Sequence, residues 1–322
     1  MWAVVLKGFG DESVLAIGDV PRPKLGPDDI RIAVSATAVN RADLLQREGH
    51  YPPPPGASPI LGLECAGTVV EVGTNVTGWR TGERAMALLP GGGYAEQVVV
   101  NAGSAMHAPE TITDEEAAAM PEAFLTAFLN LFILGTAKRG ERVLIHGGGS
   151  GVGTAATTLA KIAGLHVIVT AGSAHKCARC MKHGADEAID YHDDDFTERA
   201  RDVDVVLDHI GAQYLPRDLQ VLRTGGRVVI IGSMGGEKKA EIDVSAVLAK
   251  RLQIIGSTLR ARPVEEKAHI VEAFMARFGD NLRAGKIKPV IDSVFPLEKI
   301  ADAHRRMKGD HFGKIVLRTE AR

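Results

Sequence analysis

The chain has 322 residues, of which 45% are hydrophobic and 24% charged, enough for two domains with cores of their own. Its net charge of −2 and its 5% aromatic content argue against a nucleic-acid or anionic-membrane partner. No stretch approaches the roughly 20 apolar residues of a membrane span. No signal peptide is recognisable, and three cysteines indicate a reducing compartment. We therefore expect a soluble, cytoplasmic protein.

The first 121 residues are rich in short strands separated by turns. Residues 40–48 form the only segment here with a helical pattern. Proline and glycine clusters at 51–56 and 90–93 interrupt the chain. This pattern predicts a β-rich domain, a partly open barrel, with strands at residues 3–6, 29–36, 67–72, 85–88 and 95–100.

After residue 121, helical patterns alternate regularly with apolar strands. This alternation predicts an α/β fold with a doubly wound parallel sheet of about six strands. Beyond a long helix expected at 263–283, strands are expected again at 290–295 and 314–317, so the end of the chain is expected to fold back into the first domain. The predicted domains are a β-rich domain and a parallel-sheet domain, comprising residues 1–121 with 287–322, and 122–286.

A glycine-rich turn follows the apolar strand at 143–145 and precedes a helical pattern. Its spacing, Gly148-x-Ser150-x-x-Gly153, departs from G-x-G-x-x-G because serine replaces the second glycine. Glycines let the backbone approach a phosphate, and a helix N-terminus favours an anion. The turn therefore predicts a dinucleotide site, although a tight strand–helix turn without a ligand would use the same residues.

The strand after this helix ends without an acidic residue. A site selective for NAD places Asp or Glu here, where it binds the ribose 2′-hydroxyl. This chain has the small residues Gly172 and Ser173, followed by Lys176. Room and positive charge at this point favour the 2′-phosphate of NADPH, although Lys176 is also explained as an ordinary solvated residue.

Several further motifs run in order over nearly the whole chain. They are Asn40-Arg-Ala-Asp43 with Gln46, 51–56, Leu61-Gly-Leu-Glu64, 86–93, 121–127, Ser150-Gly-Val-Gly-Thr154, 170–173 and 313–316. In these motifs the chain resembles the zinc-free quinone oxidoreductases of the medium-chain dehydrogenase/reductase superfamily. Within this zeta-crystallin-like branch it looks most like the stress-inducible type. The resemblance implies a GroES-like catalytic domain beside a Rossmann domain.

The resemblance implies no metal site. The zinc-dependent relatives bind their catalytic metal with a Cys and a Gly-His-Glu motif, and the corresponding places here are Asn40 and Gly62-Leu63-Glu64. Cys177-x-x-Cys180 lies in a predicted helix without a second pair nearby, whereas zinc needs about four ligands. Cys65 is interpreted as a small buried residue.

Without a metal to polarise a carbonyl, hydride transfer requires an acceptor that is already electrophilic. The expected function is therefore an NADPH-dependent quinone reductase. The resemblance assigns cofactor contacts to Asn40 and Thr126 at the nicotinamide, Gly151 and Val152 at the pyrophosphate, and Ser173, Lys176 and Tyr191 at the 2′-phosphate. It further assigns Ile210, Gly232, Ser233 and Met234 along the cofactor, and Leu259 and Lys314 closing the cleft.

Tyr51 and Gln46 are the candidates for contact with the acceptor, since Tyr51 could stack on a quinone ring. The Ser150 hydroxyl could reach the nicotinamide carboxamide. Each residue also has a structural interpretation; Tyr51, for example, could anchor its proline-rich loop. His146 and His209 lie on predicted strands and are interpreted as core histidines.

Two alternatives remain open. An alkenal or enone reductase would use the same cofactor geometry with another acceptor. A protein of another class, crystallin-like or RNA-binding, would bind NADPH with little turnover, although the charge pattern argues against RNA. In either case the apolar strand at 253–258 is expected at a sheet edge, where it would pair with a second copy in a homodimer.

Overall fold

The computed structural model describes residues 1–319 and divides the chain into two compact units. Unit 1 comprises Met1–Leu125 and Leu259–Arg322, and unit 2 comprises Thr126–Thr258. Each unit has its own sheet and hydrophobic core. The predicted combination of a β-rich and a parallel-sheet α/β unit is confirmed.

Unit 1 contains a seven-stranded, mostly antiparallel sheet. Six of its strands have the order β14-β15-β3-β4-β5-β7, and the seventh, β6, pairs with β3. Strands β1 and β2 form a separate antiparallel hairpin. Alternate β3 side chains such as Ile30 and Ile32 are fully buried, as expected of a strand that packs one face on a core. The strands are β1 (Trp2–Leu6), β2 (Leu15–Asp19), β3 (Asp29–Val39), β4 (Glu64–Val72), β5 (Arg84–Leu88), β6 (Gln97–Asn101), β7 (Ala105–His107), β14 (Ile291–Pro296) and β15 (Lys314–Arg318).

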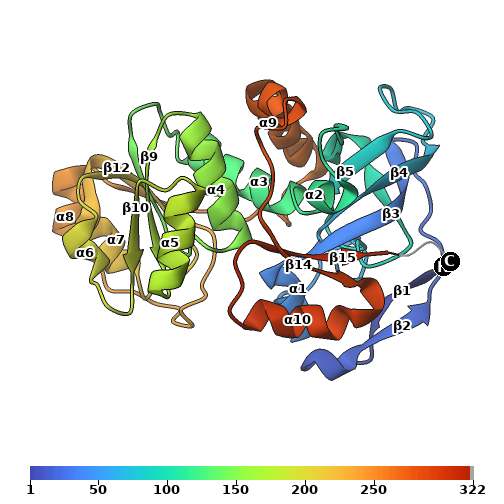
Figure 1. Cartoon of the computed structure of the whole chain (residues 1–322), viewed down its shortest axis with the longest axis horizontal. Helices are drawn as coiled ribbons and strands as arrows, with labels where there is room; N and C mark the ends of the chain where they lie inside the picture. The colour runs from blue at the N-terminus through green and yellow to red at the C-terminus, as the bar shows by residue number, and fades with distance from the viewer. Residues whose placement is uncertain (320–322) are drawn as a thin grey trace. The chain divides into compact units, whose positions relative to one another are not determined.

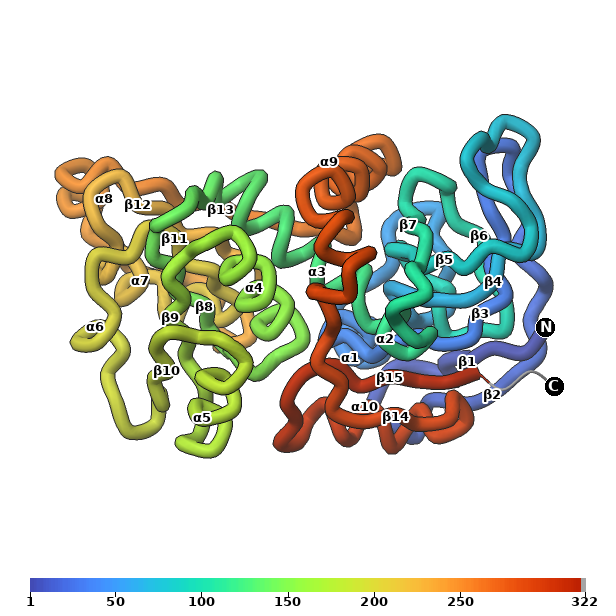
Figure 2. The backbone as a smooth tube through the Cα atoms, turned by 45° about the horizontal axis from the view of Figure 1, so that its top comes forward, coloured from blue at the N-terminus to red at the C-terminus, as the bar shows by residue number. Residues whose placement is uncertain are grey.

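A C-terminal strand joins the main sheet of unit 1. Strand β15 runs antiparallel to β3 and parallel to β14, with Val316 opposite Ala38. Figure 2 follows this red segment back to the blue strands of the N-terminal part. The helices of unit 1 are α1 (Arg41–Arg47), α2 (Asp114–Ala118), α9 (Val264–Arg283) and α10 (Ile300–Lys308), with short 3₁₀ turns η1 (Glu12–Val14), η2 (Ala102–Ser104) and η4 (Leu297–Lys299).

Unit 2 is a doubly wound, six-stranded parallel sheet with the order β10-β9-β8-β11-β12-β13. Helices α4 and α5 cover one face, and α6, α7 and α8 lie on the other side (Figure 1). The strands are β8 (Arg142–Ile145), β9 (His166–Ala171), β10 (Glu187–Asp190), β11 (Val203–Asp208), β12 (Leu222–Ile230) and β13 (Gln253–Gly256). The helices are α4 (Gly151–Ile162), α5 (Ala174–His183), α6 (Phe196–Arg199), α7 (Leu215–Val221) and α8 (Val244–Lys250).

The strand order reverses between β8 and β11. Both strands are apolar runs buried on both faces, which is typical of central parallel strands. Ligands of such sheets bind beyond the carboxyl ends of the strands at this reversal. The glycine-rich turn after β8 therefore lies at the expected binding position.

Two features differ from the sequence-based expectations. The first helical segment after residue 120 is α-helical only in α3 (Pro121–Phe128) and continues as the π-helical segment η3 (Leu129–Leu134). The predicted parallel-sheet domain extends to residue 286 and so includes helix α9, whereas unit 2 ends at Thr258. This helix packs against η2 and β7 in unit 1, and its Phe274 and Phe278 side chains are buried.

Candidate functional site

The glycine turn of unit 2 joins β8 to α4 through a tight backbone path. Gly147 has a φ of 62°, and the Gly148 N–H donates to the Thr170 carbonyl at 2.8 Å. Ser150 is the N-cap of α4, and its Oγ accepts a hydrogen bond of 2.9 Å from the Gly153 N–H. The serine that replaces the second glycine therefore has a structural task, and its hydroxyl hydrogen remains available to a ligand.

Glycine is required at this turn by close packing. A Cβ atom at Gly153 would lie 2.3 Å from the Gly147 carbonyl oxygen, and one at Gly148 would lie 2.6 Å from Cβ of Val169. The chain thus folds back on itself while the N-terminus of the 12-residue helix α4 follows directly. Gly151 and Val152 supply the N–H groups of its first turn, so the turn fits a cofactor phosphate.

The ends of β9 and β10 bring four predicted cofactor residues together. A Cβ atom at Gly172 would lie 2.5 Å from the Tyr191 hydroxyl, so the phenol sits against this glycine. Ser173 caps α5 by accepting from the Lys176 N–H at 3.2 Å. The predicted 2′-phosphate residues Gly172, Ser173, Lys176 and Tyr191 therefore form one cluster.

The ends of β11 and β12 form a second cluster. The Met234 N–H donates to the His209 carbonyl at 2.9 Å, and the Gly235 N–H donates to Ile210 at 2.9 Å. A Cβ atom at Gly232 would lie 3.0 Å from the His209 carbonyl oxygen. Ile210, Gly232, Ser233 and Met234 are thus neighbours, as a common contact with one ligand requires.

His146 is a satisfied core residue, as expected from the sequence. Its Nδ1 lies 3.0 Å from Thr170 Oγ1, its Nε2 lies 2.8 Å from Asp218 Oδ1, and the ring is buried. The His209 ring lies against Gly147, and burial followed by the charge of His146 lowers its pKa to about 4. His209 therefore packs against the glycine turn, and His146 is linked to it through the Thr170 hydroxyl.

Unit 1 contains a buried polar cluster that joins three distant parts of the chain. Lys314 Nζ donates to Asn40 Oδ1 at 2.6 Å and to Glu64 Oε1 at 2.7 Å. Asn40 Nδ2 donates to the same Glu64 oxygen at 2.8 Å. All three side chains are buried, and removing one partner of such an ion pair costs about 3–5 kcal/mol.

The Asp43 carboxylate fixes the backbone at Asn40. Its carboxylate accepts hydrogen bonds from the backbone N–H groups of Asn40 at 2.8 Å and Gly62 at 2.9 Å, and from the Tyr94 hydroxyl at 3.1 Å. Burial raises the pKa of Asp43 to about 6, against the opposing effect of these bonds and of Lys314. Asp43 thus fixes the start of α1 and the backbone that carries Asn40.

Glu122, in the first turn of α3, lies beside this cluster. Its backbone N–H donates to Glu64 Oε2 at 2.9 Å. Its own Oε2 is buried and accepts no hydrogen bond from the residues the structure describes. Burial, followed by repulsion from Glu64, raises the pKa of Glu122 to about 8. Protonation of Glu122 is therefore favoured at this position.

Arg260 connects the two predicted acceptor residues. Its Nη2 donates to Gln46 Oε1 at 2.6 Å, its Nε donates to the Pro90 carbonyl at 2.8 Å, and its guanidinium carbon lies 5.3 Å from the Tyr51 ring centroid. Burial and the charge of Glu122 raise the pKa of Tyr51, which stays a neutral phenol. Tyr51 and Gln46 are therefore neighbours of one cation.

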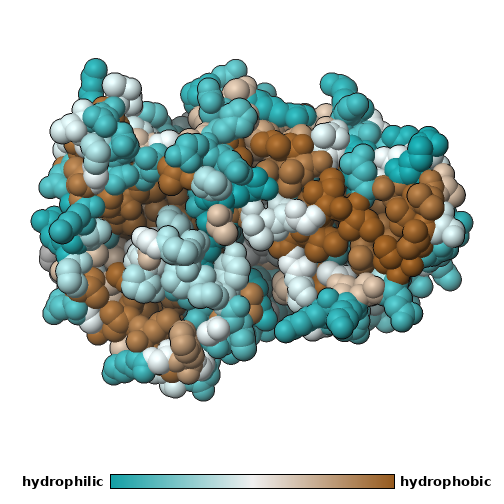
Figure 3. Space-filling model, turned by 180° about the vertical axis from the view of Figure 1, so that it is seen from behind, coloured by the Kyte–Doolittle hydropathy of each residue, from teal (hydrophilic) through white to brown (hydrophobic). Residues whose placement is uncertain are grey.

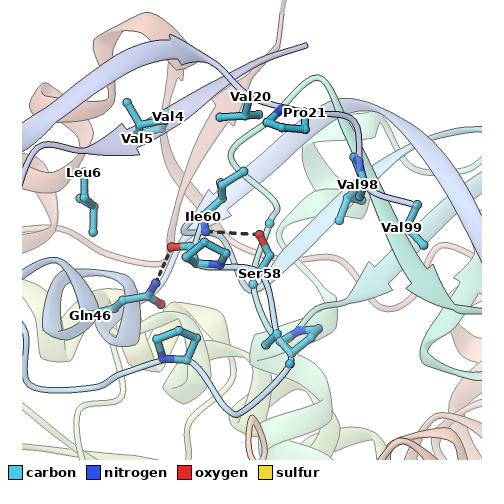
Figure 4. Close-up of a pocket in the computed structure, with 18 of the residues that line it drawn as sticks. Val4, Val5, Leu6, Val20, Pro21, Gln46, Ser58, Ile60, Val98 and Val99 are labelled. Atoms are coloured by element: carbon cyan, nitrogen blue, oxygen red, sulfur yellow. Dashed lines mark hydrogen bonds between the residues drawn. The ribbon is translucent and has the colours of Figure 1, made fainter. Parts of the chain in front are cut away.

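A groove of about 900 Å³ lies beside Gln46 in unit 1. Val4, Leu6, Ile60 and Val98 line it, and Gln46 Nε2 donates to the Pro59 carbonyl at 2.9 Å at one end (Figure 4). Its largely hydrophobic lining suits an apolar molecule.

The predicted site residues divide between the units. Asn40, Gln46, Tyr51, Leu259 and Lys314 belong to unit 1, and Thr126 and the residues of the glycine turn and strand ends belong to unit 2. Sequence reasoning gave no role to Asp43, Tyr94, Glu122 or Arg260. A signal was available for Glu122, a single charge that directly follows a proline at the start of an apolar helix.

Within residues 1–319, no group of three or more His, Cys, Asp or Glu side chains is arranged to hold a metal ion. At the position that matches the metal-binding motif, Leu63 offers no ligand atom, and the Lys314 ammonium would repel a cation from Asn40 and Glu64. Cys177 and Cys180 lie on α5, where burial raises the pKa of the Cys180 thiol to about 12.

Comparison with known proteins places this geometry in a family. The model of the alcohol dehydrogenase GroES-like domain matches residues 26–110, and that of the zinc-binding dehydrogenases matches residues 183–317. Rat quinone oxidoreductase is 31% identical over 327 residues, covering 98% of this chain and 97% of its own. The chain belongs to the medium-chain dehydrogenase/reductase superfamily.

Solved structures of this superfamily share the fold. An NAD-dependent alcohol dehydrogenase superposes with a TM-score of 0.85 at 31% identity, covering 99% of this chain and 100% of its own. The CurK enoyl reductase superposes with a TM-score of 0.84 at 27% identity, with 99% of both chains covered. Like other members of the superfamily, this oxidoreductase takes a nicotinamide cofactor. No helix within residues 1–319 is long and apolar enough to cross a membrane.

Proposed function

We propose that this medium-chain dehydrogenase/reductase is an NADPH-dependent quinone reductase that works without a metal. The observation that carries this proposal is the ammonium group of Lys314 between Asn40 and Glu64. These side chains do not suit a metal ion, so the carbonyl of a simple alcohol substrate would lack a Lewis acid. An acceptor that is already electrophilic, such as a quinone, needs no such activation.

The cofactor proposal rests on the ends of β9 and β10. One structural neighbour is named as NAD-dependent, so the choice of cofactor depends on the residues of this chain. A serine and a glycine, with Lys176 and the Tyr191 hydroxyl, occupy the place where NAD-selective sites have an acid. These groups accept a 2′-phosphate without charge repulsion. A bound NADPH would supply the hydride.

The acceptor proposal rests on Tyr51, Gln46 and Arg260. A half-buried phenol beside a guanidinium offers a ring face for stacking and hydrogen-bond donors for quinone oxygens. The name of the rat relative supports a quinone as acceptor.

Reduction of an activated C=C bond is the second candidate. It is supported by the similarity to the CurK enoyl reductase. The two candidates use the same hydride donor and differ only in the acceptor, so a panel of acceptors separates them.

The test is NADPH oxidation by the purified protein with ortho- and para-quinones and with α,β-unsaturated ketones. We expect turnover with at least one quinone at a kcat/KM more than tenfold above that of any enone. We also expect EDTA to leave this rate unchanged. Faster reduction of enones would favour the second candidate, and NADPH binding without turnover would indicate a binding protein instead.

A further inference from the structure

The carboxyl group of Glu64, which is fully buried, and that of Glu122, whose Oε2 is buried, are neighbours with very unequal hydrogen bonding. Glu64 accepts from Lys314 Nζ at 2.7 Å, from Asn40 Nδ2 at 2.8 Å and from the Glu122 backbone N–H at 2.9 Å. Three donors, one of them a cation, stabilise the ionised form of Glu64. The Glu64 carboxyl group is therefore fully supplied with hydrogen-bond donors.

The Glu122 carboxyl group lacks this support. Its buried Oε2 accepts no hydrogen bond from any part of the chain that the structure describes. Burial and the negative charge of Glu64 both favour its protonated form, and the pKa of about 8 follows from these two causes. Where the environments of two carboxyl groups differ in this way, the protonated one is suited to act as an acid.

Charged groups from several elements face Glu122. Asp43 on α1 adds repulsion, whereas Lys314 on β15 and Arg260 before α9 attract its negative form. The charge of Glu122 in turn favours the charged form of Lys267 on α9, which is also buried. Cations are thus in place to stabilise the carboxylate once a proton has left.

The charge of Glu122 also affects the candidate acceptor residue. It raises the pKa of the Tyr51 phenol and favours the charged form of Arg260, whose guanidinium carbon lies 5.3 Å from the Tyr51 ring centroid. Thr126, the residue assigned to the nicotinamide by resemblance, follows four positions later on the same helix, where side chains share a face. The same helix face thus carries the acid and a residue expected at the hydride donor.

We propose that Glu122 is the proton donor of the reaction, held as a neutral carboxylic acid until the acceptor is reduced. This proposal rests on the proposed function. The quinone receives two electrons and one proton as a hydride from the nicotinamide, and its oxygen receives the second proton from Glu122. The products are the hydroquinone, the oxidised nicotinamide and the Glu122 carboxylate, which then regains a proton from water.

The first test is an infrared titration of the free protein, which requires no substrate. We expect the carbonyl-stretch band of a protonated carboxyl group to disappear with a midpoint near pH 8. It should be absent in Glu122→Gln and retained in the control Glu110→Gln, whose side chain is exposed. A band that still disappears with a midpoint near pH 8 in Glu122→Gln would overturn the proposal, whereas a band that disappears near pH 6 belongs to other carboxyl groups such as Asp43. If the variant does not fold, absence of any such titration between pH 7 and 9 in the unaltered protein would do so.

The second test compares the pH profiles of quinone reduction. In the unaltered protein, kcat/KM should fall above about pH 8. Glu122→Gln should lose this limb and slow turnover on the order of 100-fold at pH 7, with its NADPH dissociation constant changed less than twofold. An unchanged rate and profile in Glu122→Gln would overturn the proposal. A protein that reduces no quinone at all would overturn the proposed function, and the proton-donor role with it, while the titration result would stand.

Discussion

Ser173 caps helix α5 and is also expected to contact the 2′-phosphate of NADPH. A substitution that keeps the cap can test the second role alone. Its hydroxyl caps α5, and Asp or Asn caps a helix about equally well. Ser173→Asp therefore adds a negative charge at the proposed 2′-phosphate position without removing the cap. We expect the dissociation constant for NADPH to rise at least about tenfold, since one unfavourable charge contact costs over about 1.4 kcal/mol. Fluorescence titration of NADPH and NADH measures both affinities.

Ser173→Asn is the matched control, because it keeps the cap and adds no charge. Its NADPH affinity should change less than threefold, and NADH binding should be nearly equal in both variants. If Ser173→Asp binds NADPH as tightly as Ser173→Asn does, the 2′-phosphate lies elsewhere.

Among single residues, those of a site that are close together in the sequence could be predicted from it. Ser150 and Gly153 lie within one turn, and their spacing alone indicated a tight strand–helix connection. Arg260 was missed because its partner Gln46 is 214 residues away, and no local pattern signals such a contact. Glu122 was missed because its unusual environment depends on Glu64 and Lys314, which only the fold brings close.

The β8–turn–α4 element tolerates no added atom at its closest approach. Gly153→Ala would place Cβ 2.3 Å from the Gly147 carbonyl oxygen, a backbone atom that cannot move aside alone. We expect a loss of about 1–3 kcal/mol in the free energy of unfolding, or roughly 2–4 °C in Tm per kcal/mol, and weaker NADPH binding.

Gly309→Ala is the control for this substitution, because its nearest atom beyond the chain neighbours would lie at 3.5 Å and its φ is −90°. Its Tm should differ by less than about 2 °C. Equal Tm values for the two variants would show that the turn adjusts without cost. Thermal unfolding followed by circular dichroism provides the comparison.

At the scale of elements, buried parallel strands were easier to predict than short antiparallel ones. Strands β8 and β9 of unit 2 contain the buried apolar runs 143–145 and 167–169. Strands β2 and β7 and helix α2 were not anticipated, because segments of five, three and five residues are too short to show a period. The unit to which α9 belongs depends on long-range packing, which periodicity does not reveal.

For the whole molecule, β13 leaves an open edge of the parallel sheet. Ile254 on β13 is 40% exposed, and Leu248 and Val244 on α8 are 72% and 60% exposed. Figure 3 shows a broad hydrophobic region on the half that carries unit 2. Exposed apolar surface at a free strand edge favours pairing with a second copy, and the homodimer therefore stays a prediction. The cytoplasmic location also stays a prediction.

Ile254→Lys should convert the expected dimer into a monomer at micromolar concentration, since two lysines would be buried near the pairing axis. Ile162→Lys is the control, because this residue on α4 is similarly exposed, at 38%, away from the edge. Sedimentation velocity measures the masses. A monomeric unaltered protein, or a dimeric Ile254→Lys, would contradict this assembly.

The pairing of β15 with β3 also has a consequence for biosynthesis. Unit 2 is one continuous stretch and can fold as soon as residue 258 has left the ribosome. Strand β3 emerges early, yet its neighbour β15 is synthesised about 280 residues later, so the sheet that holds Asn40 and Glu64 stays incomplete until then. Lys314, which neutralises Glu64, arrives with that last strand. A nascent chain would therefore carry a complete parallel-sheet unit beside an incomplete β-rich one until β15 is synthesised.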